Sequence, residues 1–161
     1  EGVREIAAHS AADIVLSAVK TIVKTIDVDD DASTDDYQFD DDAADTTEQV
    51  ITLTEIVPAW AEVTSIQLRC LETVTGSQTM SIDVGTTSGG GELLTAAEVD
   101  SANDLLATAA GDAPELASAA AARSVYVNAT PGGNWNTLDA GRWSIAITYI
   151  DYGAAVSQAA P

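Results

Sequence analysis

The sequence predicts an all-β protein, an antiparallel β-sandwich with jelly-roll-like closure. Three observations lead to this prediction. Short runs in which apolar and polar residues alternate recur along the 161-residue chain, and this period of two is that of a half-buried strand. Turns that contain glycine or proline separate the runs, and no strand–helix–strand rhythm interrupts them. Six or seven such strands form two packed sheets, and jelly-roll closure protects their edges.

Two strands are predicted in the first third of the chain. Residues 15–28 are rich in β-branched side chains and alternate, with Ile22 and Ile26 on one face. Residues 50–57, VITLTEIV, form the second strand, and a turn at residues 58–60 follows it.

The next two runs predict a β-hairpin. Residues 61–72, AEVTSIQLRCLE, and residues 78–85, QTMSIDVG, alternate in the same way on either side of a turn at residues 75–77. The apolar face of this pair is predicted to consist of Ile66, Leu68, Cys70, Met80, Ile82 and Val84.

Two further strands are predicted near the end of the chain. Residues 124–129, SVYVNA, precede a strong turn signal, PGGN, at residues 131–134. Residues 141–153, GRWSIAITYIDYG, then place four large side chains on one face, namely Trp143, Ile145, Ile147 and Tyr149.

The remaining segments differ in composition from the strands. The predicted organisation is an N-terminal arm (1–16), a β-sandwich domain (17–153) and a C-terminal tail (154–161). Within the sandwich, residues 27–48 form an acidic loop. Residues 86–122, rich in alanine and acid, form either a long loop or a short helix at about residues 96–109.

The charge of the chain excludes two classes of partner. There are 26 acidic and six basic residues, which gives a net charge of −20. Nucleic acids and anionic membrane surfaces both require a basic face, so neither is an expected partner. Such an excess of acid is typical of halophilic settings, where salt screens the self-repulsion of the chain.

More than a third of the acidic residues lie in the loop of residues 27–48. Tyr37 and Phe39 within it are expected to pin the loop to the domain or to a neighbour. Its carboxylates alternate in a way similar to a calcium loop, but Ala32 replaces the turn glycine of such a loop and Gln38 its bidentate glutamate. A solvated loop and a calcium site therefore stay open as alternatives, and no other cofactor is expected. The candidate calcium ligands are Asp27, Asp29, Asp31 and Asp35.

No catalytic constellation is recognisable, so an enzyme is not expected. The only histidine, His9, and the only cysteine, Cys70, stand 61 positions apart (70 − 9). This spacing indicates neither a nucleophile with its base nor a zinc site. Cys70 falls on the apolar face of its strand and is expected to be buried. Carboxylate pairs at glycosidase spacing arise by chance among so many acids.

The three tryptophans have different predicted roles. Trp143 shares its face with core residues, and Trp60 follows a turn proline. Trp135, in the turn sequence PGGNWN, is the candidate for an exposed tryptophan. It would stack on a sugar, anchor its loop or contact a neighbouring subunit, and the last two roles are favoured.

Residues 51–85 read ITLTEIVPAWAEVTSIQLRCLETVTGSQTMSIDVG and are followed by the loop GGGELLTAAEVDSA. This stretch resembles small virion proteins of tailed viruses, either phages or viruses of haloarchaea. The shared order is a strand, a proline turn, a strand, the SIDVG hairpin and a loop that opens with small and acidic residues. The closing GRWSIAITYIDY is similar to the last strand of such proteins. The resemblance covers about half of the chain and includes no catalytic motif.

The resemblance implies a jelly-roll-like structural virion protein that decorates or cements the capsid surface of an extracellular particle. The expected partners are the major capsid protein or other virion subunits, with further copies of the chain in a homotrimer. The candidate interface residues are Ile6, Ile14, Val15, Leu16 and Trp135. The alternative is a receptor- or glycan-binding head, or a fibre or tail accessory module. Trp135 and the loop of residues 92–122 would then form its recognition surface.

Overall fold

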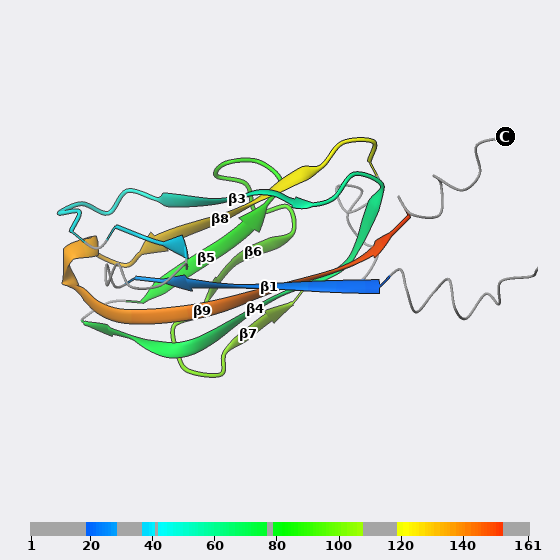
Figure 1. Ribbon diagram of the computed structural model, residues 1–161. Coiled ribbons are helices and arrows are strands. Elements are labelled where there is room, and N and C mark those ends of the chain that lie inside the picture. The colour runs from blue at the N-terminus through cyan, green and yellow to red at the C-terminus, as the bar shows by residue number, and fades with distance from the viewer. Residues whose placement is uncertain (1–18, 29–36, 41, 77–78, 108–118, 153–161) are drawn as a thin grey trace, which may run out of the picture.

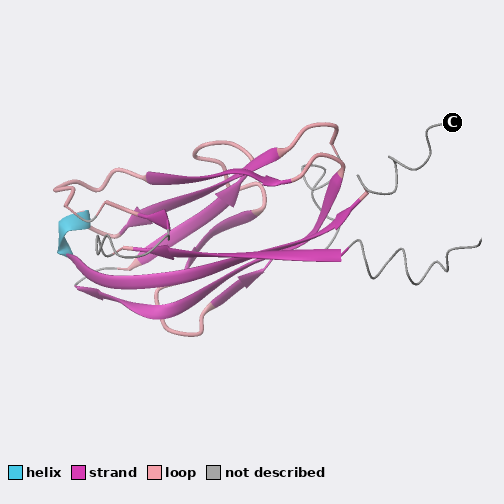
Figure 2. Cartoon of the chain, viewed as in Figure 1, coloured by secondary structure: helices cyan, strands magenta, loops and turns pink. Residues whose placement is uncertain are grey.

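The computed structural model describes residues 19–28, 37–40, 42–76, 79–107 and 119–152. Within these ranges the chain forms nine β-strands and one short 3-10 helix (Trp135–Thr137). The strands make two sheets that pack face to face (Figure 1; Figure 2). The predicted all-β sandwich is therefore confirmed. None of the described residues form a helix long and apolar enough to cross a membrane.

The first sheet has five strands in the order β2-β1-β9-β4-β7. Its strands are β1 (Val19–Asp27), β2 (Tyr37–Gln38), β4 (Ala61–Gly76), β7 (Leu105–Ala107) and β9 (Leu138–Asp151). Neighbouring strands are antiparallel, except that β1 and β2 run parallel over two residue pairs. The long strands β4 and β9 form the centre of this sheet.

The second sheet has four antiparallel strands in the order β3-β8-β5-β6. Its strands are β3 (Gln49–Val57), β5 (Met80–Gly85), β6 (Leu94–Glu98) and β8 (Arg123–Pro131).

The connections between the two sheets are those of a jelly roll. If the two-residue β2 is set aside, the first strand pairs with the last (β1 with β9) and the second with the seventh (β3 with β8). The third pairs with the sixth (β4 with β7), and the fourth with the fifth (β5 with β6). This nested pairing is what results when one long antiparallel ribbon is rolled into a double sheet.

The predicted hairpin of residues 61–72 and 78–85 is wrong. β4 and β5 lie in different sheets, so the turn after β4 carries the chain across the sandwich. Gly76 allows this crossing, because its φ of 108° is unfavourable for other residues and the Thr137 backbone leaves no room for a Cβ. Two strands that face each other across a core alternate just as two arms of a hairpin do, so the pattern does not separate the two arrangements.

The inward faces predicted for these strands are confirmed. The side chains of Ile66, Leu68 and Cys70 on β4 and of Met80, Ile82 and Val84 on β5 are all buried. The same holds for the four large residues of β9, Trp143, Ile145, Ile147 and Tyr149. The Trp143 indole also donates a hydrogen bond of 2.6 Å to the Val99 carbonyl, which satisfies its one polar group inside the core.

The short helix considered for residues 96–109 does not form in the described part of that range. Residues 94–98 are β6 and residues 105–107 are β7, each held at the edge of its sheet by a longer strand. Helix propensity is a weak signal in an alanine-rich segment, and pairing with β5 and β4 overrides it here.

The end of the acidic segment is fixed by two aromatic side chains. Phe39 is buried, and its ring centre lies 5.4 Å from that of Trp135. The Trp135 indole donates a hydrogen bond of 2.7 Å to the Thr47 carbonyl, and the Trp135 backbone N–H donates one of 3.0 Å to the Asp45 backbone carbonyl. The expectation that Phe39 pins this segment to the domain is confirmed.

This packing confirms the loop-anchoring role predicted for Trp135 and corrects its predicted exposure. Its side chain is fully buried, so it is neither an exposed sugar-stacking residue nor an interface residue. The sequence PGGNWN predicts a turn of the local backbone, but it does not predict whether the tryptophan side chain is buried. Burial comes from the segment of residues 39–47, which lies some ninety positions earlier in the chain and covers the ring.

Replacement of Phe39 by alanine is expected to lower the free energy of unfolding by about 3 to 5 kcal/mol, because it leaves a cavity beside Trp135. Urea denaturation followed by circular dichroism measures this loss. The control is Val50→Ala on the outer face of β3, which is expected to change stability by less than about 0.5 kcal/mol. A loss below about 1 kcal/mol for Phe39→Ala would show that the acidic segment is not anchored there.

Candidate interaction surface

An exposed aromatic pair lies where β4 begins and β9 ends. Trp60 precedes β4 and is 46% exposed, and Tyr152 follows β9 and is 37% exposed. The Tyr152 N–H donates a hydrogen bond of 3.2 Å to the Trp60 carbonyl, so the ladder between the two strands continues to this pair. The sequence assigned Trp60 only to a turn, and its exposure follows from the absence of a covering segment among the described residues.

The backbone of Trp60 is held in an unfavourable conformation. Its φ is 63°, a value that bulky L-residues rarely adopt. Its N–H donates a hydrogen bond of 2.6 Å to the Ala119 carbonyl, and its own carbonyl accepts the bond from Tyr152. Strain of this kind persists where surrounding contacts enforce it, and it is most frequent at functional sites.

Tyr152 is oriented by Glu62. The tyrosine hydroxyl donates a hydrogen bond of 2.9 Å to the Glu62 carboxylate. This bond to an anion raises the pKa of Tyr152. Two exposed aromatic side chains thus lie at the end of the β4–β9 ladder, and Glu62 holds the hydroxyl of one of them, Tyr152.

The remaining predicted interface residues, Ile6, Ile14, Val15 and Leu16, lie outside the described residues. The same is true of three candidate calcium ligands, Asp29, Asp31 and Asp35, and of His9. Asp27 is the one calcium candidate that is described. It lies on β1 opposite Arg142, and its carbonyl accepts a hydrogen bond of 2.9 Å from Phe39. Among the described residues no three His, Cys, Asp or Glu side chains form a group that could hold a metal ion.

Cys70 is buried, as its position on the apolar face of its strand predicts. It is 1% exposed, and its thiol donates a hydrogen bond of 3.1 Å to the Glu72 carbonyl. Burial, reinforced by the nearby carboxylate of Asp104, raises the pKa of the Cys70 thiol to about 11. A thiol with this pKa stays protonated and unreactive near neutral pH.

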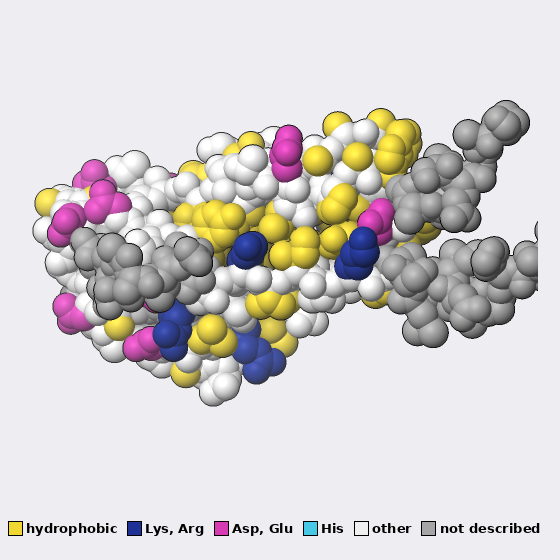
Figure 3. All heavy atoms as spheres, in the orientation of Figure 1, with side chains coloured by type: hydrophobic (Ala, Val, Ile, Leu, Met, Phe, Trp, Pro, Cys, Tyr) yellow, Lys and Arg dark blue, Asp and Glu magenta, His cyan; other side chains and the backbone are white. Residues whose placement is uncertain are grey.

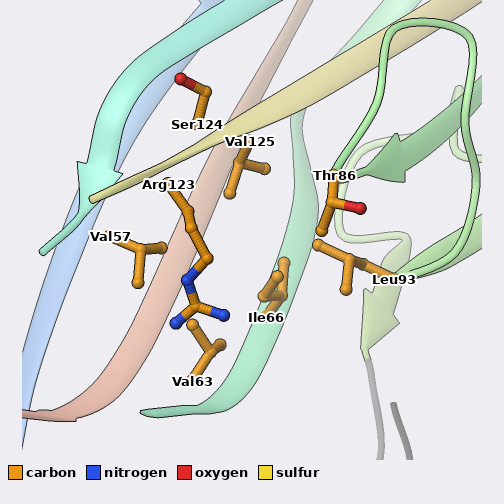
Figure 4. A pocket seen from close by; sticks show the side chains of 8 residues that line it. All are labelled: Val57, Val63, Ile66, Thr86, Leu93, Arg123, Ser124 and Val125. Atoms are coloured by element: carbon orange, nitrogen blue, oxygen red, sulfur yellow. The ribbon is translucent and has the colours of Figure 1, made fainter. Parts of the chain in front are cut away.

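One basic side chain is drawn into the end of the sandwich. Arg123 of β8 extends between Val57 and Val63, and its guanidinium donates a hydrogen bond of 2.6 Å to the Ala61 carbonyl (Figure 4). Burial lowers the pKa of Arg123. The cavity beside it measures about 10 Å³, enough for a single water molecule. This side chain supports the turn that carries Trp60, because Ala61 follows Trp60 directly.

No protein family matches the sequence, and no curated protein matches it. Two solved structures contain similar chains. One is a chain of the cyanophage Pam1 capsid asymmetric unit, with a TM-score of 0.52 and 16% sequence identity over 83% of this chain and 84% of that one. The other is a chain of the capsid of Ralstonia phage GP4, with a TM-score of 0.49 and 23% identity over 83% and 86% of the two chains.

The feature shared with the Pam1 chain is the fold. At 16% identity the likeness concerns the sandwich and not the chemistry of individual residues. The expected likeness to virion proteins of phages is thus confirmed at the level of the fold.

Trp60 is expected to be the tryptophan that solvent reaches, because Trp135 and Trp143 are both fully buried. Acrylamide quenching of tryptophan fluorescence tests this. The variant Trp60→Phe should lose most of the quenchable emission, whereas the matched variant Trp143→Phe should keep it. Equal quenching of the two variants would contradict the exposure of Trp60 and the burial of the other two tryptophans.

Cys70 is expected to resist thiol reagents in the folded protein at pH 8, because the thiolate that reacts forms only near its raised pKa of about 11. Labelling with a chromogenic disulfide measures this. The same protein unfolded in urea is the control, and it should react at the rate of a free thiol. Folding raises the pKa of Cys70, so the folded state holds the thiol proton more tightly than the unfolded chain does. The contribution of the protonated thiol to stability is therefore complete below the pKa of the unfolded chain and is lost as the pH rises from there through about 11.

Proposed function

We propose that this chain is a non-enzymatic structural subunit of a virus particle, a decoration or cement protein on the capsid surface. The observation that carries the proposal is the jelly-roll sandwich shared over 83% of the chain with a chain of the Pam1 capsid asymmetric unit. Jelly rolls are a common architecture of viral capsid domains, although lectins and enzymes also use them. The sequence resemblance of residues 51–85 and of the last strand points to the same class independently.

A cement protein acts by burying surface between subunits. The stabilisation amounts to about 25 cal/mol per Å² of apolar area before the entropic cost of association is subtracted. The exposed aromatic pair suits this task, because tryptophan and tyrosine dominate the binding energy of protein interfaces. In this proposal the chain is a homotrimer that contacts the major capsid protein, and residues 1–16 form an arm that reaches the shell or a neighbour.

A specific observation also favours the alternative of a glycan-binding module. Trp60 offers an exposed ring, and the Glu62 carboxylate, which bonds to the Tyr152 hydroxyl, is an acceptor for sugar hydroxyls. In this alternative the recognition surface would be at Trp60, because Trp135 is buried. A glycan array probed with the full chain distinguishes the two functions, since a cement protein gives no signal that depends on Trp60.

The chain is expected to occur in purified virus particles in a fixed ratio to the major capsid protein. When it is added back to shells from which it was removed, it should bind and raise the temperature at which they open. Deletion of residues 1–16 is expected to weaken this binding at least about tenfold, and deletion of residues 154–161 is the matched control. The amount bound, measured by sedimentation with the shells, provides the comparison.

Shells that open at the same temperature with and without the bound chain would contradict the cementing role. Equal occupancy by the two deletion variants would contradict the role of the arm while leaving the cementing role intact.

A further inference from the structure

We infer that the outer face of the five-stranded sheet is the surface through which copies of this chain associate. Among the described residues, seven large hydrophobic side chains are exposed. Val50 belongs to the other sheet. The six that lie on this sheet or directly beside its strands are Val19, Val23, Trp60, Leu71, Leu105 and Tyr152. Apolar exposure gathered on one side of a molecule marks an interaction surface, whereas single exposed residues are ordinary.

The strand register joins the exposed side chains of β1 and β9 into one surface, whereas Leu105 of β7 lies on the far side of Arg69 of β4. On β1, Val19 and Val23 are 47% and 59% exposed, and they lie opposite Ile150 and Ala146 of β9. Alternate residues of a strand share a face, so the apolar rows run along β9 toward its end. There Tyr152 follows β9 beside the exposed tryptophan, and the surface ends on the aromatic pair.

The hydroxyls of β1 and β9 between these rows are already paired, whereas Gln67 and Arg69 of β4 lie exposed on the same face opposite Ala146 and Ser144. The hydroxyls of Thr21 on β1 and Thr148 on β9 lie 3.0 Å apart and bond to each other. The Thr64 hydroxyl bonds to the Thr148 carbonyl at 3.2 Å. A partner that covers the part of the face formed by β1 and β9 therefore leaves these hydroxyls satisfied, and it must pair with Gln67 and Arg69 where it reaches β4. The Val and Thr side chains are also stiff, so ordering them on association costs little entropy.

The charge of the sheet identifies the occupant as a second copy of the chain. The five strands carry four basic and five acidic residues, a net charge of −1 (4 − 5), whereas the whole chain carries −20. In the space-filling view, Asp and Glu side chains gather at the loop end of the molecule, while Lys and Arg lie along the strands (Figure 3). Two copies repel each other wherever their acidic loops meet, and this sheet is where that repulsion is smallest.

The charges at the margin of the face are of both signs. Lys20 and Asp151 form an ion pair of 2.7 Å at one end of the sheet, and Arg142 lies 3.7 Å from Glu72 toward the other. A surface with charges of both signs offers a partner for each charge of a neighbouring copy. A basic partner, in contrast, would gain most from the acidic loops and not from this sheet.

The size of the face also fits a stable complex. The 14 residues of β9 extend roughly 45 Å, and the three long strands together are roughly 15 Å wide, so the face covers roughly 700 Å². This is close to the roughly 800 Å² that each partner contributes to a typical stable interface.

The inference rests on the proposed function, because it names the surface that a self-associating virion subunit would use. Different experiments can refute the inference and the proposed function. Association of the isolated chain in solution tests the surface, and binding to shells tests the function.

The experiment is sedimentation velocity of the full chain over a range of concentrations, in physiological and in molar salt. The wild type is expected to associate, and more tightly in high salt. Val23→Glu should raise the dissociation constant at least about 30-fold, since it places a carboxylate in an apolar interface. The control Val50→Glu adds the same charge to an exposed valine of the other sheet and should change it by no more than about threefold.

A second variant tests the same surface in case Val23→Glu does not fold. Trp60→Asn suits the left-handed backbone at that position and removes the indole, so it should also weaken association. In the wild type, acrylamide quenching of Trp60 should fall as the chain associates. The inference is overturned if the wild type stays monomeric throughout, if Val23→Glu and Val50→Glu weaken association equally, or if Trp60 stays equally quenchable in the complex.

Discussion

The pairing of β9 with both β1 and β4 is the interaction on which the rest of the structure depends. β9 hydrogen-bonds along its length to β1 on one side and to β4 on the other. It brings the first and last described strands together and supplies four large buried side chains. Because long antiparallel ladders fix the register of every side chain, this one strand decides which residues face the core and which face outward.

The same register separates the two kinds of surface that the protein presents. Inward positions carry Ile, Leu and Trp, and most outward positions of β1 and β9 carry Val, Thr, Ser and Ala, while β4 adds Gln67 and Arg69. Much of the acid lies outside the described strands. An acidic protein built in this way keeps one flat face on which like-charge repulsion does not oppose packing. This arrangement gives the proposed role in a particle its physical basis.

The alternating runs around Ile66, Met80 and Ile145 were sufficient to predict an all-β sandwich and most of its inward faces, because burial on a pleated strand requires a period of two. Burial of Cys70 followed from the same pattern. The prediction failed where two arrangements have the same local pattern. β4 and β5 alternate as a hairpin does, yet they face each other across the core. β6 lies in an alanine-rich stretch that also permits a helix, and its pairing with β5 decided the outcome.

The sequence by itself determined the fold class, the strand faces and the acidic character of the chain, since each depends on local periodicity or on composition. Only the tertiary structure decided which tryptophan is buried and which is exposed. Phe39 and Thr47 approach Trp135 from about ninety residues away and cover it, whereas Trp60 is held outward by backbone hydrogen bonds to Ala119 and Tyr152. Such contacts join distant parts of the chain, and a local pattern contains no record of them.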